Sequence, residues 1–350
     1  MHEYRFDRLC IKRGLRLLAT IAALYVCGCG APLTSAPSAS PGAGGSSQPR
    51  VVSAPVLGFA WDSTALVLRQ IDGVPGAAKV DASGDIGSGF AMAVASGSHD
   101  YALLLNSKGA LYLATLPGGT PRQISAGTWS GLAISASGGY AIVYAASGTA
   151  PQLISGLPQQ PAFHNMDGSP AGITAAAVAD DGTALLAAHA NGGGVALLAV
   201  PLGGTASRVM TVGAFGGMAF VPGTDRALVA DAASGTVTQL SNMNGAPSAS
   251  LVSGAKIAQP VGLDISADGR WALAANGLGT VLRIDLSGQA QPETMKCNCV
   301  PTTVAGLSGS AFRLTEAGTA TGWMVDAGGA SPRVLFIPAL PGQKQAGGGQ

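Results

Sequence analysis

A phrase recurs along this chain, and its period constrains the fold more than any other feature of the sequence. The fullest copy is GLDISADGRWALAAN at residues 262–276, followed by GTVLRID at residues 279–285. Looser copies begin at Ala91, Gly131, Ala175 and Gly217. Matching positions in successive copies are 39, 44, 42, 45 and 41 residues apart: Tyr101, Tyr140, Ala184, Arg226, Trp271 and Phe312. Such self-similarity indicates one supersecondary unit stacked several times.

Each copy predicts a set of short antiparallel strands. In the fullest copy these are Leu263–Ile265, Trp271–Ala275 and Val281–Leu286, separated by turns rich in Gly, Ser, Asp and Asn, and a less regular edge strand follows. Four strands in about 42 residues are typical of a β-propeller blade. Residues 51–340 therefore predict an all-β propeller of seven four-stranded blades. The rival folds are a pair of β-sandwiches, whose strands would not share one long period, and a β-helix, whose coils are much shorter.

The repeat also resembles a known family. SADGxxALAAN followed by GTVxxID is similar to the YVTN-type propeller repeat of bacterial envelope proteins, which is related to the lactonase-like propellers. The unit at 262–286 matches closely, and the other units match in part. The resemblance implies a structural motif, and because such families include enzymes, adhesins and proteins of unknown role, it implies a fold rather than an activity.

Residues 1–29 are typical of an export signal. A basic front of five Lys and Arg residues precedes an apolar run from Leu17 to Val26, which is shorter than the roughly 20 residues that span a bilayer. The run ends in Val26-Cys-Gly-Cys29, which resembles the bacterial lipoprotein box and implies that Cys29 becomes the lipidated first residue. Cys27 departs from that pattern, where Ala, Ser or Thr is usual. Ordinary cleavage near Ala31 and an uncleaved signal are the alternatives.

The segments that flank the repeats predict a tethered envelope protein. Residues 30–50 are rich in Pro, Ser and Gly and predict a flexible tether, and residues 341–350 predict a disordered tail. Removal of residues 1–28 leaves 14 basic and 16 acidic residues, a net charge of −2. With no basic patch, nucleic acid is not an expected partner. The predicted partners are the membrane, through the N-terminal lipid, and an envelope protein or small ligand.

Ligands of propellers usually bind where the turns between second and third strands emerge beside the crossings between blades. By their place in the repeat, we expect this face to carry Asp62, Asn106, His189, Asn191, Asp231, Asn276 and Glu316. Most are Asn or Asp at the start of a Gly-containing turn, where the ordinary role is to close that turn. A ligand site requires several of them to converge around the axis.

The segment Ser155–Gly172 is the longest predicted crossing between blades and the favoured functional loop. It contains His164, Asn165 and Asp167 within four residues. His164 and His189, together with Asp167 or Asp231, could hold a divalent metal ion, although their spacing is not diagnostic of one. No cofactor is identified by the sequence.

Cys297 and Cys299 form a second candidate site. Two cysteines in an exported protein are expected to oxidise, but residues two apart in an extended strand lie about 6.6 Å apart with parallel side chains. Asn298 and Pro301 favour a turn that could bring the sulfur atoms together. A structural disulfide, a free pair, a redox pair and a pair of metal ligands all remain open.

The chain lacks sequence signatures of catalysis. No Gly-x-Ser-x-Gly elbow, phosphate loop or dinucleotide fingerprint stands in the strand–turn–helix setting that each requires. The favoured function is therefore an exported, lipid-anchored propeller that binds or scaffolds partners in the cell envelope without catalysis. The alternative is a lactonase- or lyase-type propeller enzyme that uses His164, Asp167 and His189 around a divalent ion.

Overall fold

The computed structural model of this chain describes residues 54–87, 89–146, 148–316 and 322–338. These residues form 27 strands. No helix occurs among them, so none is long and apolar enough to cross a bilayer. The expected signal at 1–29 with Cys29, the tether at 30–50 and the tail at 341–350 lie outside the described residues.

Hydrogen bonding groups the strands into seven antiparallel sheets, called blades 1 to 7 in chain order. Blades 1 to 3 comprise β1 (Val56–Asp62), β2 (Val67–Asp72) and β3 (Lys79–Ile86); β4 (Phe90–Ala95), β5 (Tyr101–Asn106), β6 (Leu111–Thr115) and β7 (Arg122–Ser125); and β8 (Gly131–Ile134), β9 (Tyr140–Tyr144), β10 (Gln152–Ser155) and β11 (Ala162–Asn165). Blades 4 and 5 comprise β12 (Ile173–Val178), β13 (Ala184–His189), β14 (Val195–Val200) and β15 (Ser207–Val212); and β16 (Phe215–Phe220), β17 (Ala227–Asp231), β18 (Thr236–Ser241) and β19 (Ser248–Lys256). Blades 6 and 7 comprise β20 (Pro260–Ile265), β21 (Trp271–Asn276), β22 (Thr280–Asp285) and β23 (Glu293–Lys296); and β24 (Pro301–Gly306), β25 (Ala311–Glu316), β26 (Gly322–Asp326) and β27 (Arg333–Ile337).

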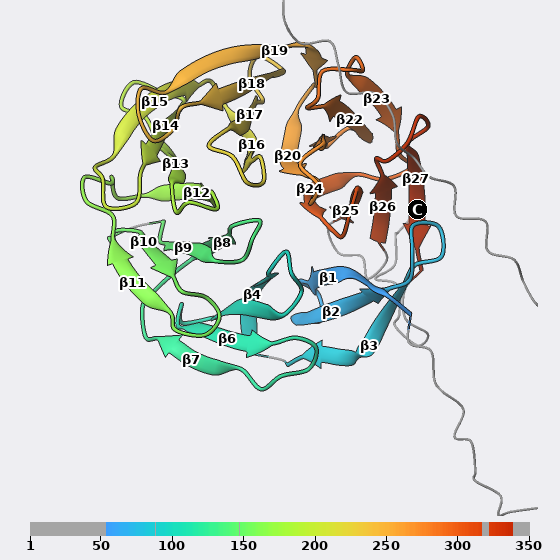
Figure 1. Cartoon of the computed structure of the whole chain (residues 1–350), viewed down its shortest axis with the longest axis horizontal. Coiled ribbons are helices and arrows are strands. Elements are labelled where there is room, and N and C mark those ends of the chain that lie inside the picture. Colours follow the sequence, from blue (N-terminus) through green and yellow to red (C-terminus); the bar gives the residue numbers. More distant parts are fainter. Residues whose placement is uncertain (1–53, 88, 147, 317–321, 339–350) are drawn as a thin grey trace, which may run out of the picture. The chain divides into compact units, whose positions relative to one another are not determined.

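The blades are arranged around a central channel, with the first strand of each blade innermost and the last at the rim (Figure 1). This confirms the predicted seven-bladed β-propeller. Blades 2 to 7 have four strands, whereas blade 1 has three within the described residues. Blade 1 is also the blade whose sequence departs most from the repeat.

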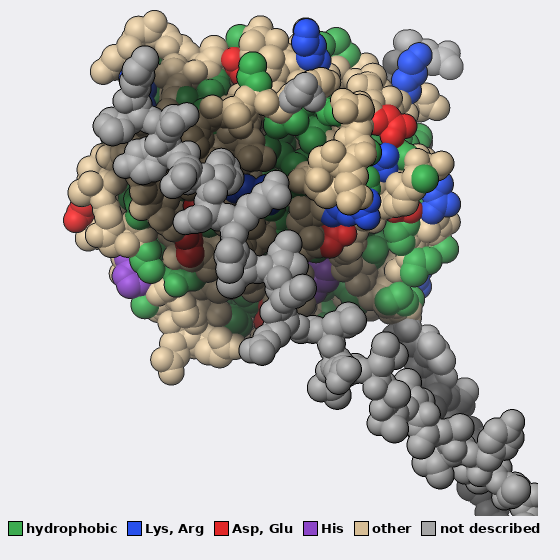
Figure 2. Space-filling view, turned by 45° about the horizontal axis from the view of Figure 1, so that its top comes forward, with side chains coloured by type: hydrophobic (Ala, Val, Ile, Leu, Met, Phe, Trp, Pro, Cys, Tyr) green, Lys and Arg blue, Asp and Glu red, His purple; other side chains and the backbone are tan. Residues whose placement is uncertain are grey.

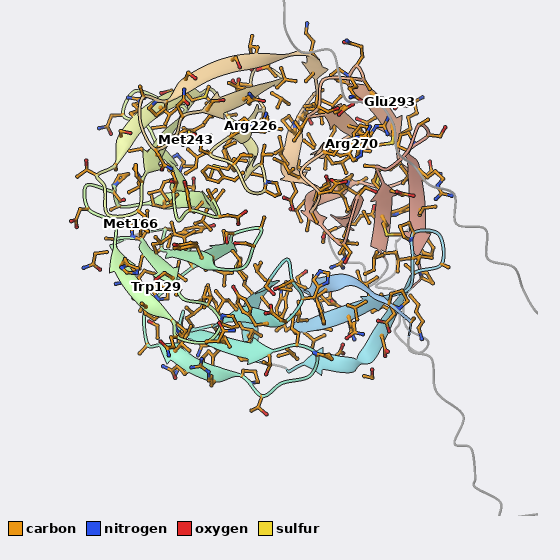
Figure 3. All side chains as sticks on the ribbon, in the orientation of Figure 1. Trp129, Met166, Arg226, Met243, Arg270 and Glu293 are labelled. Atoms are coloured by element: carbon orange, nitrogen blue, oxygen red, sulfur yellow. A yellow bond between two sulfur atoms is a disulfide. The ribbon has the colours of Figure 1, made fainter. Side chains whose placement is uncertain are left out.

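The apolar core is divided into seven clusters, one at each junction between neighbouring blades. Figure 3 shows side chains filling these junctions, with Met166 between blades 3 and 4 and Met243 between blades 4 and 5. Second strands are buried on both sides, and all six residues of β21 are buried. Burial on both sides explains why WALAAN and ALLAAH are almost continuously apolar rather than alternating.

The SADG part of the repeat forms the turn between the first and second strands. In blade 6 the Ser266 hydroxyl accepts a hydrogen bond from the N–H of Trp271 at 2.9 Å, and the backbone of Ser266 donates to the Trp271 carbonyl at 2.8 Å. Gly269 has a φ of +69° and donates to the carbonyl of Ser266 at 2.8 Å. The motif therefore specifies a tight hairpin through one hydroxyl and one left-handed residue.

Within the part of the chain that the structure describes, blades 1 and 7 share no strand: those of blade 7 are all C-terminal and those of blade 1 all N-terminal. The two blades meet through an apolar cluster that includes Leu57, Ile71 and Leu307. The N–H of Ser308 also donates to the Leu57 carbonyl at 2.8 Å. Side-chain packing and individual hydrogen bonds hold blades 7 and 1 together. The other six pairs of neighbouring blades are also joined by a crossing of the chain.

Candidate functional site

Turns between second and third strands emerge on the same side of the ring as the crossings between blades, because neighbouring strands are antiparallel. We call this side the channel face. The first-to-second and third-to-fourth turns lie on the opposite face. Each inner strand begins at the channel face and runs down the channel wall.

A hollow of about 190 Å³ lies against the inner strands of blades 4 to 7. Every residue that lines it is uncharged: Ala175, Ala176, Phe215, Gly217, Met218, Val261, Gly262, Leu263, Thr303 and Val304. These residues occupy positions within the first four of the six-residue strands β12, β16, β20 and β24, so the hollow extends from the channel-face part of the wall to its middle. The hollow is therefore an uncharged recess, lined by mostly small apolar side chains together with one hydroxyl and backbone polar groups.

Glycine allows the inner strands to approach each other along this hollow. A Cβ on Gly217 would lie 2.5 Å from the backbone nitrogen of Leu263, and a Cβ on Gly262 would lie 3.0 Å from that of Val304. Both of these Cβ-to-nitrogen distances are as short as, or shorter than, the closest contacts that Cβ atoms make in proteins. The backbones of β16, β20 and β24 consequently form a narrow wall in which side chains at these levels would not fit.

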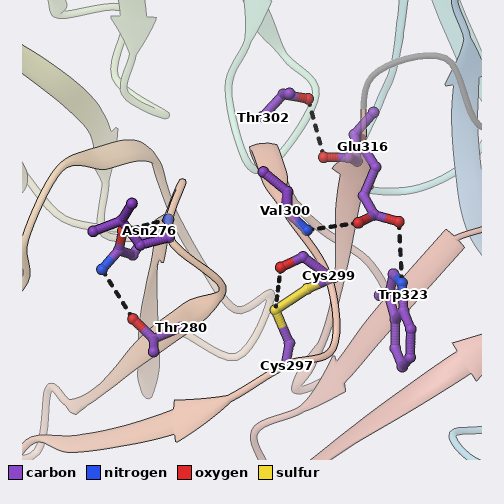
Figure 4. The surroundings of a disulfide bond; sticks show 10 residues. Asn276, Thr280, Cys297, Cys299, Val300, Thr302, Glu316 and Trp323 are labelled. Atoms are coloured by element: carbon purple, nitrogen blue, oxygen red, sulfur yellow. Dashed lines mark hydrogen bonds between the residues drawn. A yellow bond between two sulfur atoms is a disulfide. The ribbon is translucent and has the colours of Figure 1, made fainter. Parts of the chain in front are cut away.

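The Asn and Asp side chains predicted at the channel face mostly close their own turns. The Asn106 amide oxygen accepts from the N–H groups of Lys108 and Ala110 at 3.0 and 2.9 Å. The Asn276 oxygen accepts from the Leu278 N–H at 2.8 Å, and its NH2 group donates to the Thr280 hydroxyl at 3.0 Å (Figure 4). The ordinary structural role thus accounts for the positions of Asn106 and Asn276.

Asp231 also serves its own blade. Its Oδ1 accepts from the N–H groups of Ala214 and Ala233 at 3.0 and 2.9 Å, and its Oδ2 accepts from the Ser234 hydroxyl at 2.9 Å. Burial on its own would raise the pKa of Asp231, but these hydrogen bonds outweigh burial, and the pKa is lowered. The carboxylate is held charged by groups that also fix its position.

Glu316 joins the end of β25 to two neighbouring segments. Its Oε1 accepts from the Val300 N–H at 2.6 Å, and its Oε2 accepts from the Trp323 indole N–H at 3.1 Å (Figure 4). This fixes the crossing that enters blade 7. None of these contacts points Glu316 into the hollow.

Asp62 lies on the opposite face, which corrects its expected place. It ends β1 and begins the first-to-second turn, where its Oδ1 accepts from the N–H groups of Thr64 and Ala65 at 3.0 and 2.9 Å. Its Oδ2 accepts from the Arg69 guanidinium at 3.0 Å. Asp62 is part of the junction between blades 7 and 1 and not of the channel face.

The segment Ser155–Gly172 is only partly a crossing, so the expectation of one long loop was wrong. It contains β11, the outermost strand of blade 3, and the crossing itself is confined to residues 166–172. His164 and Asn165 lie on β11, where His164 Nε2 is 2.8 Å from the Ser155 hydroxyl and Asn165 accepts from Gln152 at 2.9 Å. Both are exposed at the rim of the ring.

The structure does not assemble the predicted metal ligands. His189 ends β13 and Asn191 stands in the turn that follows, both on the channel face, whereas Asp167 lies in the crossing after β11. Within the described ranges, no three His, Cys, Asp or Glu side chains are grouped closely enough to hold a metal ion. His164, Asp167 and His189 are therefore three separate surface positions.

Cys297 and Cys299 are joined by a disulfide bond in the crossing from blade 6 to blade 7 (Figure 4). Their Cα atoms are 5.1 Å apart, closer than extended residues at this spacing, because residues 297–300 bend between β23 and β24. Both residues are buried, and the Cys297 N–H donates to the Gly279 carbonyl at 3.0 Å. The bond fixes this crossing beneath the second-to-third turn of blade 6.

One acidic residue of the inner wall was missed by sequence reasoning. Asp264, in β20, is partly buried, and its carboxylate accepts from the N–H groups of Ile265 and Gly306 at 2.8 and 2.6 Å. Burial in the channel wall raises the pKa of this carboxyl group. The signal was present in the repeat, because the matching position in the other copies is Ala or Val.

Charges on the surface are sparse. In Figure 2 they occur singly or beside charges of the opposite sign on the face in view. This distribution accords with a chain in which only 11% of residues are charged.

Comparison with known proteins supports the propeller fold and identifies no family. No protein-family model matches the sequence, and no curated protein matches it. Among solved structures, hydrazine synthase of Kuenenia stuttgartiensis is similar at a TM-score of 0.54 and 13% identity, over 78% of this chain and 96% of that chain. Apo AztD from Citrobacter koseri is similar at 0.55 and 10%, over 82% and 84%. A functionally unknown protein from Desulfotomaculum acetoxidans is similar at 0.51 and 14%, over 70% and 78%. At such low identity the likeness is one of architecture.

Proposed function

We propose that this chain is an exported propeller, anchored through a lipid on Cys29, that binds a ligand or partner at its channel face without catalysis. The observation that carries the proposal is the uncharged hollow between blades 4 and 7. Recesses lined by apolar side chains and a few polar groups are the usual form of a small-molecule or side-chain pocket. A rigid ring of seven blades holds this recess in a fixed shape.

The chemistry of the channel face favours binding over turnover. The carboxylates of Asp231 and Glu316 and the amide of Asn276 are occupied by hydrogen bonds within the fold. A general acid or base has to reach a substrate proton, and a group fixed by several backbone N–H groups is poorly placed for that. These side chains act as supports of the wall.

Placement in the cell envelope is supported by two independent features. The sequence of residues 1–50 is typical of a lipoprotein signal followed by a tether. The Cys297–Cys299 disulfide is a bond that persists in oxidising compartments and is rare in the cytosol. Both features agree with export.

The hollow is tested with a small neutral probe. Benzyl alcohol should bind the purified mature protein in ligand-observed NMR, and Thr303→Phe should weaken this binding at least about fivefold because the ring fills the recess. Thr302→Phe adds the same ring to the adjacent exposed residue, which does not line the hollow, and should leave binding unchanged. Equal binding by both variants would overturn the assignment of the hollow. A turnover activity abolished by substitution of one channel residue would overturn the non-catalytic role.

A further inference from the structure

At one equivalent position of the seven innermost strands, which we call a level of the inner wall, one blade differs from the other six. The level is defined by register with the second strand: Ala219 pairs with Leu228, and Asp264 pairs with Leu273. The other residues at this level are small and apolar: Ala60, Val94, Ala133, Ala177, Ala219 and Ala305. Only blade 6 places an acid here, so the wall does not need a carboxylate to form.

Asp264 is adjacent to the hollow. Gly262 lines the hollow and faces β24, where an added Cβ would meet the nitrogen of Val304. Side chains two apart on a strand share a face, so Asp264 faces β24 as well, and its Oδ2 accepts from the Gly306 N–H at 2.6 Å. The carboxylate thus lies one step of about 6.6 Å further down the channel.

The carboxylate has no cationic partner among the described residues. The four ion pairs found there involve Arg69 twice, Arg283 and Arg333, and none reaches Asp264. Two backbone N–H groups use two of its roughly four acceptor sites. A hydrogen bond from the Gly306 N–H requires only a neutral acceptor oxygen, so this contact alone does not explain an acidic residue. A partly buried negative charge without a cationic partner is costly to retain. Burial therefore favours the neutral acid, in line with the raised pKa of this carboxyl group, and a cation bound beside it would favour the carboxylate.

We propose that Asp264 binds the ammonium group of a small organic cation whose apolar body occupies the neighbouring hollow. This inference rests on the proposed function, because the hollow must accept a ligand. An uncharged wall with a single negative group at one end selects molecules that are apolar at one end and cationic at the other. Charge-assisted hydrogen bonds to the remaining carboxylate sites give that selection its strength.

The test compares two probes of similar size in the full mature protein by ligand-observed NMR or calorimetry. Benzylammonium should bind about tenfold more tightly than benzyl alcohol, as expected for a hydrogen bond to a charged group. Asp264→Asn keeps one oxygen for the Gly306 N–H, although the Ile265 N–H loses its acceptor, and should abolish the preference while benzyl alcohol still binds. Asp81→Asn makes the same change on the third strand of blade 1 and should retain the preference.

The outcomes separate the two proposals. Equal affinity of the wild type for both probes, or a preference that survives in Asp264→Asn, would overturn the role of Asp264 and leave the hollow as a binding site. Failure of both probes to bind the wild type would overturn the hollow and the role of Asp264 together. Melting temperatures of the two Asn variants report folding, and Asp264→Ala should reproduce the loss of preference if Asp264→Asn is unstable.

Discussion

The guanidinium of Arg313 donates a hydrogen bond to the backbone carbonyl of Trp61 at 3.2 Å, although the two residues are 252 positions apart. Arg313 stands in blade 7 and Trp61 in blade 1, so this bond crosses the junction where the ring closes. Burial lowers the pKa of Arg313 to about 10, which leaves it charged at neutral pH. Asp62 supplies a nearby negative charge that favours the cation.

Arg313→Ala should therefore destabilise the ring. The substitution removes a hydrogen bond from a charged donor, leaves the Trp61 carbonyl without that partner and opens space at the junction between blades 7 and 1. We expect the free energy of unfolding to fall by about 2–3 kcal/mol. Urea denaturation of the mature protein measures this cost. Arg333→Ala removes an exposed arginine from the same blade, paired with Asp326, and should cost less than about 1 kcal/mol. Equal losses in the two variants would contradict a closing role for Arg313.

Asp180 should stabilise the ring in a pH-dependent manner. Its Oδ1 accepts from the Ser137 N–H at 2.7 Å and its Oδ2 from the Gly223 N–H at 2.8 Å, so one carboxylate joins turns of blades 3, 4 and 5. Burial on its own would raise the pKa of Asp180, but the hydrogen bonds lower it overall, below the usual 3.8. A lowered carboxyl pKa contributes stability above pH 3.8 that is lost as the pH falls through the folded value.

Asp180→Asn offers one acceptor and one donor where two N–H groups need acceptors, and should cost about 1–2 kcal/mol at pH 7. The difference from wild type should shrink as the pH falls below 3.8, because the unfolded wild-type chain takes up a proton on this carboxyl group before the folded chain does. Urea midpoints at pH 7 and pH 3 measure both effects. A difference that stays constant over this range would show that the charge of Asp180 does not contribute.

His99 should make the protein less stable in mild acid. It has a φ of +60° at a turn position where blades 3, 4 and 6 have glycine, and its ring packs edge-on against Phe59 with centroids 5.8 Å apart. Burial lowers the pKa of His99 from the usual 6.5, and the charge of Asp100 opposes this only in part. Stability is then complete above pH 6.5 and falls below it, since the unfolded chain takes up the proton first.

His99→Asn should remove this dependence, and asparagine tolerates the left-handed backbone better than most residues. Urea midpoints at pH 7.5 and 5.5 should differ more in the wild type than in the variant. His189, exposed at the end of β13, provides the matched control as His189→Asn, which should retain the wild-type slope. A slope that persists in His99→Asn would assign the dependence to another group.

The proposed lipidation of Cys29 predicts a specific mature N-terminus. Mass spectrometry of protein from bacterial envelopes should show a chain that begins at Cys29 with attached acyl chains, and Cys29→Ala should release the propeller from the membrane fraction. Cys27→Ala leaves the lipidated residue intact and should keep the anchor. An unmodified chain that begins after Ala31 would exclude the anchor.

The repeat made the architecture predictable because each blade must place the same strands and turns in the same order. The spacing of Tyr101, Tyr140 and Trp271 therefore located blades directly. Where the pattern is weak, the boundaries were wrong. Asp62 was assigned to the wrong face because blade 1 departs from the motif, and His164 to a loop because β11 has only four residues.

The site was less predictable than the fold. Turn residues such as Asn276 stand out by composition, but their hydrogen bonds show that they support the backbone. Most residues that line the hollow are Ala, Gly, Val, Leu or Thr, which are common throughout the chain, and with Phe215 and Met218 they form a recess only where four inner strands adjoin. Asp264 was recognisable in principle, since a charge interrupts an apolar level of the repeat.

Because the described residues exchange no strand at the closing junction, each blade that they form is one contiguous stretch of chain. A polypeptide that emerges from its N-terminus onward can complete every such blade before the next one appears. Only the final docking of the last blade on the first has to wait for the whole chain. Gain or loss of a complete blade would likewise leave the others intact, so the ring could change its size without rebuilding any sheet.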